Sequence, residues 1–162
     1  MKELLKKIAL LVVLTLTAVA TVNAKEISQV EKKMNQLVKK YENIKGVDCT
    51  VIEKGFGLNM VKLMFNKQFG KEFMKGVTGI IIIDYSDATP QTCQALRKEL
   101  DAFISLLEEF KLDNEKEFAG SNYIRSFARP LDKKTISDFI IAMEDNDSKI
   151  IMYMAGKIKV EQ

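Results

Sequence analysis

The stretch Gly79–Asp87, GIIIIDYSD, decides the fold of this chain. Four consecutive isoleucines, preceded by a glycine and followed by a polar turn sequence, predict a buried β-strand. In an antiparallel sheet with one face open to water, apolar and polar residues alternate along each strand, and these isoleucines do not alternate. The stretch therefore predicts a strand that is covered on both faces.

Two later segments share this property, namely residues 139–141 (FII) and 150–154 (IIMYM). The centre of the predicted sheet is thus apolar on both sides, and the helices take only one of them. The other side is expected to carry Ile81, Ile83, Ile140, Ile151 and Tyr153. Its cover is the first helix, a second subunit or a hydrophobic ligand, so these five residues form a candidate partner or ligand face.

The remaining elements follow from hydrophobic periodicity. Apolar residues at steps of three and four predict helices over residues 25–45, 58–74 and 90–112, with an interruption at Gly70 in the second. Strands are expected at residues 47–52, 77–85, 121–130, 135–144 and 149–160, and DNDS at residues 145–148 supplies a tight turn between the last two. Helices that come early and strands that come late predict an α+β fold. We expect one mostly antiparallel sheet of about five strands, helices on one face, an N-terminal helix and a C-terminal β-hairpin.

The N-terminus has the pattern of a secretory signal. Residues 1–7 are basic, residues 8–22 are apolar apart from threonines, and Val22 and Ala24 place small side chains at positions −3 and −1. We expect cleavage between Ala24 and Lys25. The alternative is an uncleaved anchor, but a membrane-spanning helix needs about 20 apolar residues, and this run is shorter. No cysteine comes directly after the apolar run, since the first is Cys49, so no lipid anchor is expected.

The predicted mature chain, residues 25–162, is one domain by its length. It is expected to be periplasmic or secreted, with membrane contact only through the signal peptide before cleavage. The whole sequence has 25 basic and 22 acidic residues, and loss of Lys2, Glu3, Lys6 and Lys7 brings it closer to neutrality. This balance gives no electrostatic case for nucleic acid.

Histidine is absent from the sequence. This removes the usual serine–histidine and cysteine–histidine nucleophile systems, and it removes the commonest transition-metal ligand. Two cysteines cannot form a tetrathiolate zinc site. The sequence therefore predicts no catalytic residues, no cofactor and no metal.

Asp84 and Asp87 are the remaining candidates for chemistry. Asp84 ends an apolar run as a Walker B aspartate does, but no phosphate loop of the form GxxxxGK[ST] accompanies it. A pair of hydrolytic carboxylates would need different environments in one cleft. Acids between a strand and a helix commonly form turns, and Thr89-Pro90 is a good helix start. We therefore interpret the two aspartates as turn residues and keep a carboxylate site as the lesser alternative.

Cys49 and Cys93 are a candidate disulfide. Cys49 shares a strand face with Val47 and Val51, and Cys93 lies on the apolar stripe of the long helix, so the two thiols approach each other if that stripe packs on that face. Such a bridge would add ~3–4 kcal/mol in the chain-entropy model. The alternative is two separate buried thiols.

The order of these patterns resembles one known family. The segments KYENIKGVDCTVIEKG (residues 40–55), GIIIIDYSD and KIIMYMAGKIKV (residues 149–160) are similar to those of the domain of unknown function 4252 family, from the envelope of Bacteroides-type bacteria. The resemblance covers about residues 30–160. It implies an α+β domain in the cell envelope, with a link to envelope signalling, and it implies no catalytic residues.

Three functions remain open at this point. The first is a non-catalytic envelope protein that binds another envelope protein or a second copy of itself. The second is a carrier of an apolar small molecule, held in a cavity among Met60, Met64 and Phe65. The third is an enzyme built on Asp84 and Asp87.

Overall fold

The computed structural model of the protein describes residues 24–53, 55–69, 72–104, 107–109 and 123–159. The predicted signal segment up to residue 23 lies outside these ranges. The helices are α2 (Ala24–Tyr41), α3 (Phe56–Phe69) and α4 (Pro90–Ile104). The strands are β1 (Asp48–Ile52), β2 (Gly76–Asp84), β3 (Glu108–Glu109), β4 (Tyr123–Asp132), β5 (Thr135–Glu144) and β6 (Lys149–Lys159).

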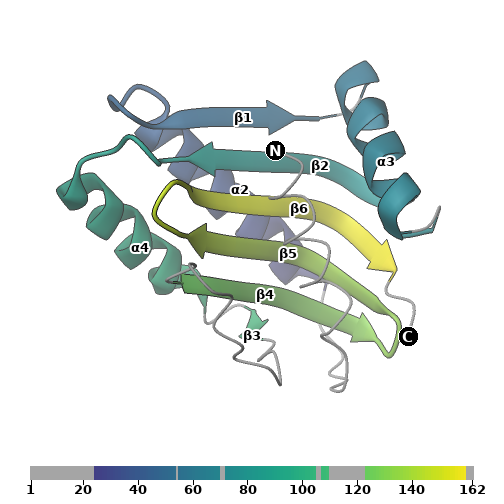
Figure 1. Cartoon of the computed structure of the whole chain (residues 1–162). Helices are drawn as coiled ribbons and strands as arrows, with labels where there is room; N and C mark the ends of the chain where they lie inside the picture. Colours follow the sequence, from purple (N-terminus) through teal and green to yellow (C-terminus); the bar gives the residue numbers. More distant parts are fainter. Residues whose placement is uncertain (1–23, 54, 70–71, 105–106, 110–122, 160–162) are drawn as a thin grey trace.

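These strands form one sheet in the order β1-β2-β6-β5-β4-β3, and every neighbouring pair is antiparallel (Figure 1). The α+β fold and the antiparallel sheet are therefore confirmed. The predicted hairpin of β5 and β6 is also present, and its turn is closed by the Asp145 N–H, which donates to the Ser148 carbonyl over 2.8 Å. β2 lies between β1 and β6, so the isoleucine run is an interior strand.

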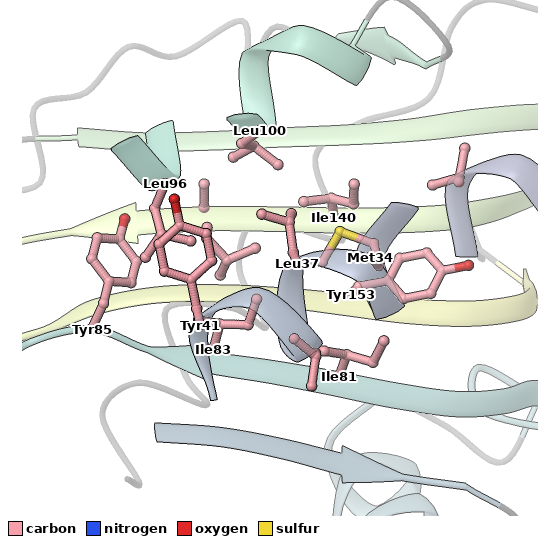
Figure 2. Packing of buried hydrophobic residues seen from close by; sticks show 14 of the residues in the cluster. Met34, Leu37, Tyr41, Ile81, Ile83, Tyr85, Leu96, Leu100, Ile140 and Tyr153 are labelled. Carbon is pink, nitrogen blue, oxygen red and sulfur yellow. The ribbon is translucent and has the colours of Figure 1, made fainter. Parts of the chain in front are cut away.

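Helices α2 and α4 lie together on one face of the sheet (Figures 1 and 2). The register places Ile81 opposite Tyr153 and Ile83 opposite Ile151, so the predicted face is a continuous set of cross-strand neighbours. All of its five members are buried in one cluster with residues of both helices: Ile81, Ile83, Ile140, Ile151 and Tyr153. Of the three covers considered for this face, the structure supplies the intramolecular one, since Met34 and Leu37 of α2 pack against it.

The third helix requires a correction, because the helices do not all share one face. Leu58 and Phe65 of α3 pack in a second cluster with Ile80, Met154 and other residues of the opposite sheet face. Both faces of β2 are apolar, so each of them needs apolar neighbours, and the short link from edge strand β1 carries the chain to that opposite side. The isoleucines that fail to alternate are thus divided between two clusters.

Several boundaries also differ from the prediction, and α3 ends at Phe69 rather than at residue 74. α4 ends at Ile104 rather than at residue 112, and the short strand β3 follows, pairing with Phe127 and Ala128 of β4. α2 ends at Tyr41 rather than at residue 45, and Gly46 lies in the turn that follows, with φ +82°. A Cβ atom there would lie 2.2 Å from the Asp87 carbonyl oxygen, so the α2–β1 turn and the β2–α4 loop can meet only at a glycine.

Candidate functional site

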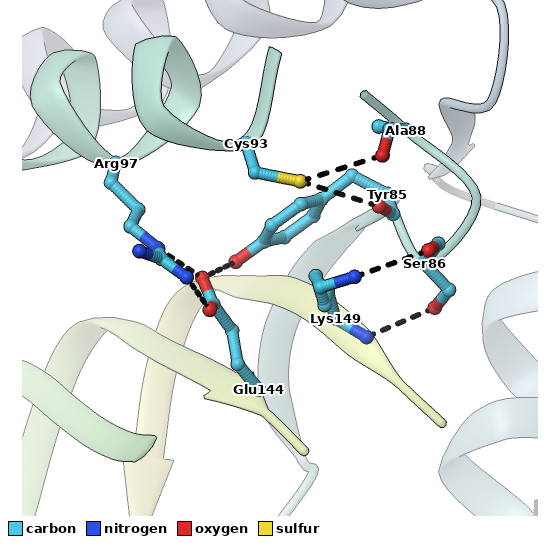
Figure 3. Close-up of polar contacts among 7 residues, drawn as sticks. All are labelled: Tyr85, Ser86, Ala88, Cys93, Arg97, Glu144 and Lys149. Carbon is cyan, nitrogen blue, oxygen red and sulfur yellow. Dashed lines mark hydrogen bonds and ion pairs between the residues drawn. The ribbon is translucent and has the colours of Figure 1, made fainter. Parts of the chain in front are cut away.

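The end of β2 and the loop that follows it carry the two aspartates that were candidates for chemistry. Asp84 accepts hydrogen bonds from the Ser86 N–H over 3.0 Å and from the Ser86 hydroxyl over 2.6 Å. The same hydroxyl accepts a bond of 2.9 Å from the Lys149 N–H, which joins the loop to the start of β6 (Figure 3). Asp87 is exposed and is not drawn into this network. Asp84 therefore acts as a turn former.

The predicted helix start is present directly after this loop. The Thr89 hydroxyl accepts a bond of 3.3 Å from the Thr92 N–H, and the Thr89 carbonyl accepts the first helical bond, from the Cys93 N–H, over 2.9 Å. Pro90 occupies the first helical position, where its missing N–H has no cost. Thr89 thus caps the start of α4, as the sequence predicted.

A buried carboxylate that the sequence did not reveal lies beside this loop. Glu144, at the end of β5, accepts hydrogen bonds from the Tyr85 hydroxyl over 2.7 Å and from Arg97 Nε over 2.6 Å (Figure 3). A second guanidinium nitrogen of Arg97 contacts the other carboxylate oxygen. Burial raises the pKa of Glu144, but the bonds from Arg97 and Tyr85 outweigh it and bring the pKa below its ordinary value. Glu144 is therefore an ionised anchor that joins β5 to α4.

A second buried carboxylate lies on β5 beneath α2. Asp138 is inaccessible to solvent, and its oxygens meet the Tyr153 hydroxyl at 2.7 Å and Arg129 Nε at 3.3 Å. Its φ of +49° coincides with the register shift between Ser137 and Phe139. This β-bulge directs the carboxylate to Tyr153. Burial raises the pKa of Asp138, and burial together with the Asp138 carboxylate raises the pKa of Tyr153.

Neither buried carboxylate can carry out chemistry on a substrate. Each is bound by an arginine and a tyrosine of the same chain, and each is nearly inaccessible to solvent. Within the part of the chain that the structure describes, no three acidic or cysteine side chains come together as metal ligands. A buried pair of this kind can fix one arrangement of strands and helices, and we assign that role to both.

The two cysteines are free thiols in the structure. Cys93 is buried on α4, and its sulfur lies 3.8 Å from the Ala88 carbonyl oxygen and 4.0 Å from that of Tyr85. Cys49 is half-buried on β1, and burial, together with the charges of Glu42 and Asp48, raises the pKa of its thiol. A thiol with a raised pKa is a poor nucleophile, so Cys49 lacks the activation that a catalytic cysteine needs.

Large apolar side chains are exposed along one side of α3. Phe56 is 80% exposed, Leu63 53%, Met64 46% and Met60 45%. We call these four residues the α3 outer face. Phe65 lies on the opposite, buried side of the helix, where it stacks on Phe73 with ring centroids 6.4 Å apart. The carrier alternative required a cavity among Met60, Met64 and Phe65, and the structure instead places the two methionines away from Phe65.

Edge strand β1 is the other exposed feature. Among the described residues it pairs only with β2, which leaves its outer edge open. Thr50 is exposed, and Val51 has 42% of its surface exposed. We call the unpaired side of Asp48–Ile52 the β1 edge.

Comparison of the chain with models of known protein families, with curated proteins and with solved structures finds no match. The resemblance to the domain of unknown function 4252 family thus stays a prediction from the sequence patterns. No helix among the described residues combines the length and the apolar character that crossing a membrane requires.

Proposed function

We propose that this protein is a non-catalytic interaction protein of the cell envelope, which binds a protein partner by adding a strand of that partner to the β1 edge. The open β1 edge is the observation that carries this proposal. An unpaired strand presents a row of backbone N–H and C=O groups, which an extended peptide can pair with.

The composition of β1 supports this use of its edge. Natural edge strands are commonly protected by proline, by inward-pointing charge or by a bulge. Residues 49–52 (CTVI) contain neither proline nor charge, and the pairing of β1 with β2 has no register shift. The exposed side chain of Val51 offers an apolar contact for a residue of the added strand. A partner can therefore gain both backbone hydrogen bonds and side-chain contact.

The buried carboxylates support a non-catalytic role. Glu144 and Asp138 are committed to internal hydrogen bonds, and Asp84 is committed to a turn. An envelope address is the expectation from the signal pattern of residues 1–24, and a part in envelope signalling is what the family resemblance implies. Met60 and Met64 do not enclose a site with Phe65, which disfavours a carrier of apolar small molecules.

Site-specific photocrosslinking in the producing cell tests the proposal. A photoreactive residue at Thr50, on the β1 edge, should give a discrete adduct with a second protein. The same residue at Gln94, which is exposed on α4, is the matched control and should give none. The double variant Thr50→Lys, Val51→Lys should abolish partner binding, because charge on an edge opposes strand addition. Equal adducts at Thr50 and Gln94, or no adduct at Thr50, would contradict the proposal.

A further inference from the structure

Helix α3 is apolar on two opposite sides. Leu58 and Phe65 are buried against the sheet, whereas the α3 outer face points away from it. Residues 56, 60, 63, 64 and 67 recur at steps of three and four, so Lys67 lies on the same side as the four apolar residues. The sheet can cover only one side of this helix. The outer face therefore leaves a contiguous apolar strip in contact with water.

The charge of α3 is of one sign. Its sequence, FGLNMVKLMFNKQF, contains Lys62 and Lys67 and no acidic residue. An apolar strip with lysine beside it is the composition of a helix that lies in the interface of a membrane, where the lysine stem follows the apolar layer and its ammonium group reaches the headgroups.

Further lysines gather at the same end of the molecule. The register places Lys157 opposite Gly76 at the start of β2 and Lys159 opposite Thr135 at the start of β5. Figure 1 shows α3, the tip of β6 and the β4–β5 turn at one end. Lys62 is half-buried, and the exposed lysines here are Lys67, Lys75, Lys133, Lys134, Lys157 and Lys159.

Few acids balance these lysines. Glu72 is shared between Lys75, at 3.3 Å, and Lys159, at 3.1 Å. Asp132, the last residue of β4, accepts a bond of 2.8 Å from the Lys134 N–H, and Glu53 is the exposed residue that follows β1. The described residues at this end are thus basic as a group, although the whole sequence carries a net charge of only +3.

From the exposed apolar strip of α3 and the basic surface around it, we infer that this end of the molecule docks on an anionic lipid surface. The α3 outer face enters the headgroup region, and the surrounding lysines are attracted to the negative surface potential. The inference is independent of strand addition at the β1 edge, since it rests on different residues.

A second copy of this chain fits the same surface less well. Two α3 outer faces packed together would bring Lys67 of both copies close to one another, without an acid on either helix. Like charges close together at an interface oppose association. An anionic bilayer supplies negative charge for the lysines and an apolar layer for the α3 outer face.

Vesicle flotation tests the inference with the exported protein. Vesicles of phosphatidylcholine with about one third phosphatidylglycerol should carry the protein upward, and vesicles of phosphatidylcholine alone should carry much less. The double variant Phe56→Gln, Leu63→Gln should weaken binding about tenfold or more, because two exposed apolar side chains no longer enter the bilayer. Variants are compared in identical preparations, so any contribution of the N-terminal segment cancels.

Two matched controls keep the test specific. Ile44→Gln replaces an apolar residue outside α3 that is 41% exposed, and it should leave binding unchanged. Lys67→Glu should weaken binding to anionic vesicles, whereas Lys98→Glu, on α4, should have a smaller effect. Raising the salt from about 0.05 M to about 0.5 M should also weaken wild-type binding, because ions screen the lysines.

Several results would overturn the inference. One is equal flotation with neutral and anionic vesicles, and another is equal loss of binding in the Ile44 and α3 variants. A third is a dimer in solution that the Phe56→Gln, Leu63→Gln variant dissociates while vesicle binding stays intact. This last result would assign the α3 outer face to a contact between copies of the chain.

Discussion

At the scale of single residues, the buried charges of this protein are structural. Glu144 is the clearest example, because its side chain is 6% exposed while its partner Arg97 is half exposed. The carboxylate cannot reach water, so its charge depends on the donors that surround it. Arg97, by contrast, can be solvated when the pair is broken. Removing Arg97 would leave a buried charge without its donor, whereas removing Glu144 leaves an arginine that water can solvate. The contribution of Glu144 to stability also depends on its ionisation, so it should change with pH.

Replacing Glu144 with glutamine should destabilise the protein by about 2 kcal/mol at pH 7, because hydrogen bonds to a charged group are lost. The pKa of Glu144 is lowered on folding, so its stabilising contribution is present above the pKa of an unfolded glutamate, about 4.3, and is lost as the pH falls through the lower folded value. The difference between wild type and Glu144→Gln should accordingly shrink below about pH 4. Urea denaturation at several pH values measures it.

A control for this titration is Asp87→Asn, which removes one exposed negative charge in the β2–α4 loop. Its effect on the free energy of unfolding should stay within about 0.5 kcal/mol at pH 7. A difference for Glu144→Gln that is the same at pH 3 and pH 7 would show that Glu144 is not held in its ionised form.

Asp84 gives a second test at the residue scale. Asp84→Ala removes the acceptor of two bonds from Ser86 and should cost about 1–2 kcal/mol of stability. Asp84→Asn keeps one carboxamide oxygen in the same place and should cost less. Thermal unfolding of the two variants measures both effects, and no loss of stability in Asp84→Ala would leave the turn role unsupported.

At the scale of elements, the main result is that α2 closes one sheet face. Val30, Met34, Leu37 and Tyr41 recur along α2 and are all buried in the cluster beneath it. Tyr41 also joins α2 to α4, since its hydroxyl donates to Glu99 over 2.8 Å. Burial, and then the Glu99 contact, raise the pKa of Tyr41 to about 12. The helix is therefore an integral layer of the fold.

Met34→Ala tests this layer. Met34 is fully buried, so its truncation should leave a cavity between α2 and the sheet and cost about 3 kcal/mol. Gln36→Ala, on the exposed side of the same helix, is the control and should change the free energy of unfolding by less than about 0.5 kcal/mol. Chemical denaturation measures both. Equal effects of the two substitutions would mean that α2 does not cover the sheet.

The arrangement of helices on the sheet could be predicted from the sequence only in part. The isoleucines that fail to alternate predicted a sheet covered on both faces, and the structure confirms apolar clusters on both. The sheet face taken by α3 could not be predicted, because apolar residues surround this helix and its periodicity does not define one buried side. The Glu144–Arg97 pair was missed for a related reason, since an acid at the end of an apolar strand has the same pattern whether it is buried or solvated.

At the scale of the whole molecule, charge and apolar surface coincide at one end. The β4–β5 turn, the last residues of β6 and α3 bring together lysines that are far apart in the sequence, so the near-neutral composition concealed this basic end. The opposite end carries the β2–α4 loop and the β5–β6 turn, which contain Asp84, Asp87, Asp145 and Asp147. A molecule with this polarity has a preferred orientation at a negative surface.

Two features define this molecule: α2 seals one sheet face, and the α3 outer face is bare. Thiol labelling of single-cysteine variants tests both parts in one measurement. In a background with Cys49→Ala and Cys93→Ala, the variants Met34→Cys, Phe56→Cys and Leu63→Cys are labelled in the native state. We predict that positions 56 and 63 react as a free thiol does, and that position 34 reacts about a thousandfold more slowly, because labelling there requires the fold to open. Equal rates at positions 34 and 56 would contradict the account.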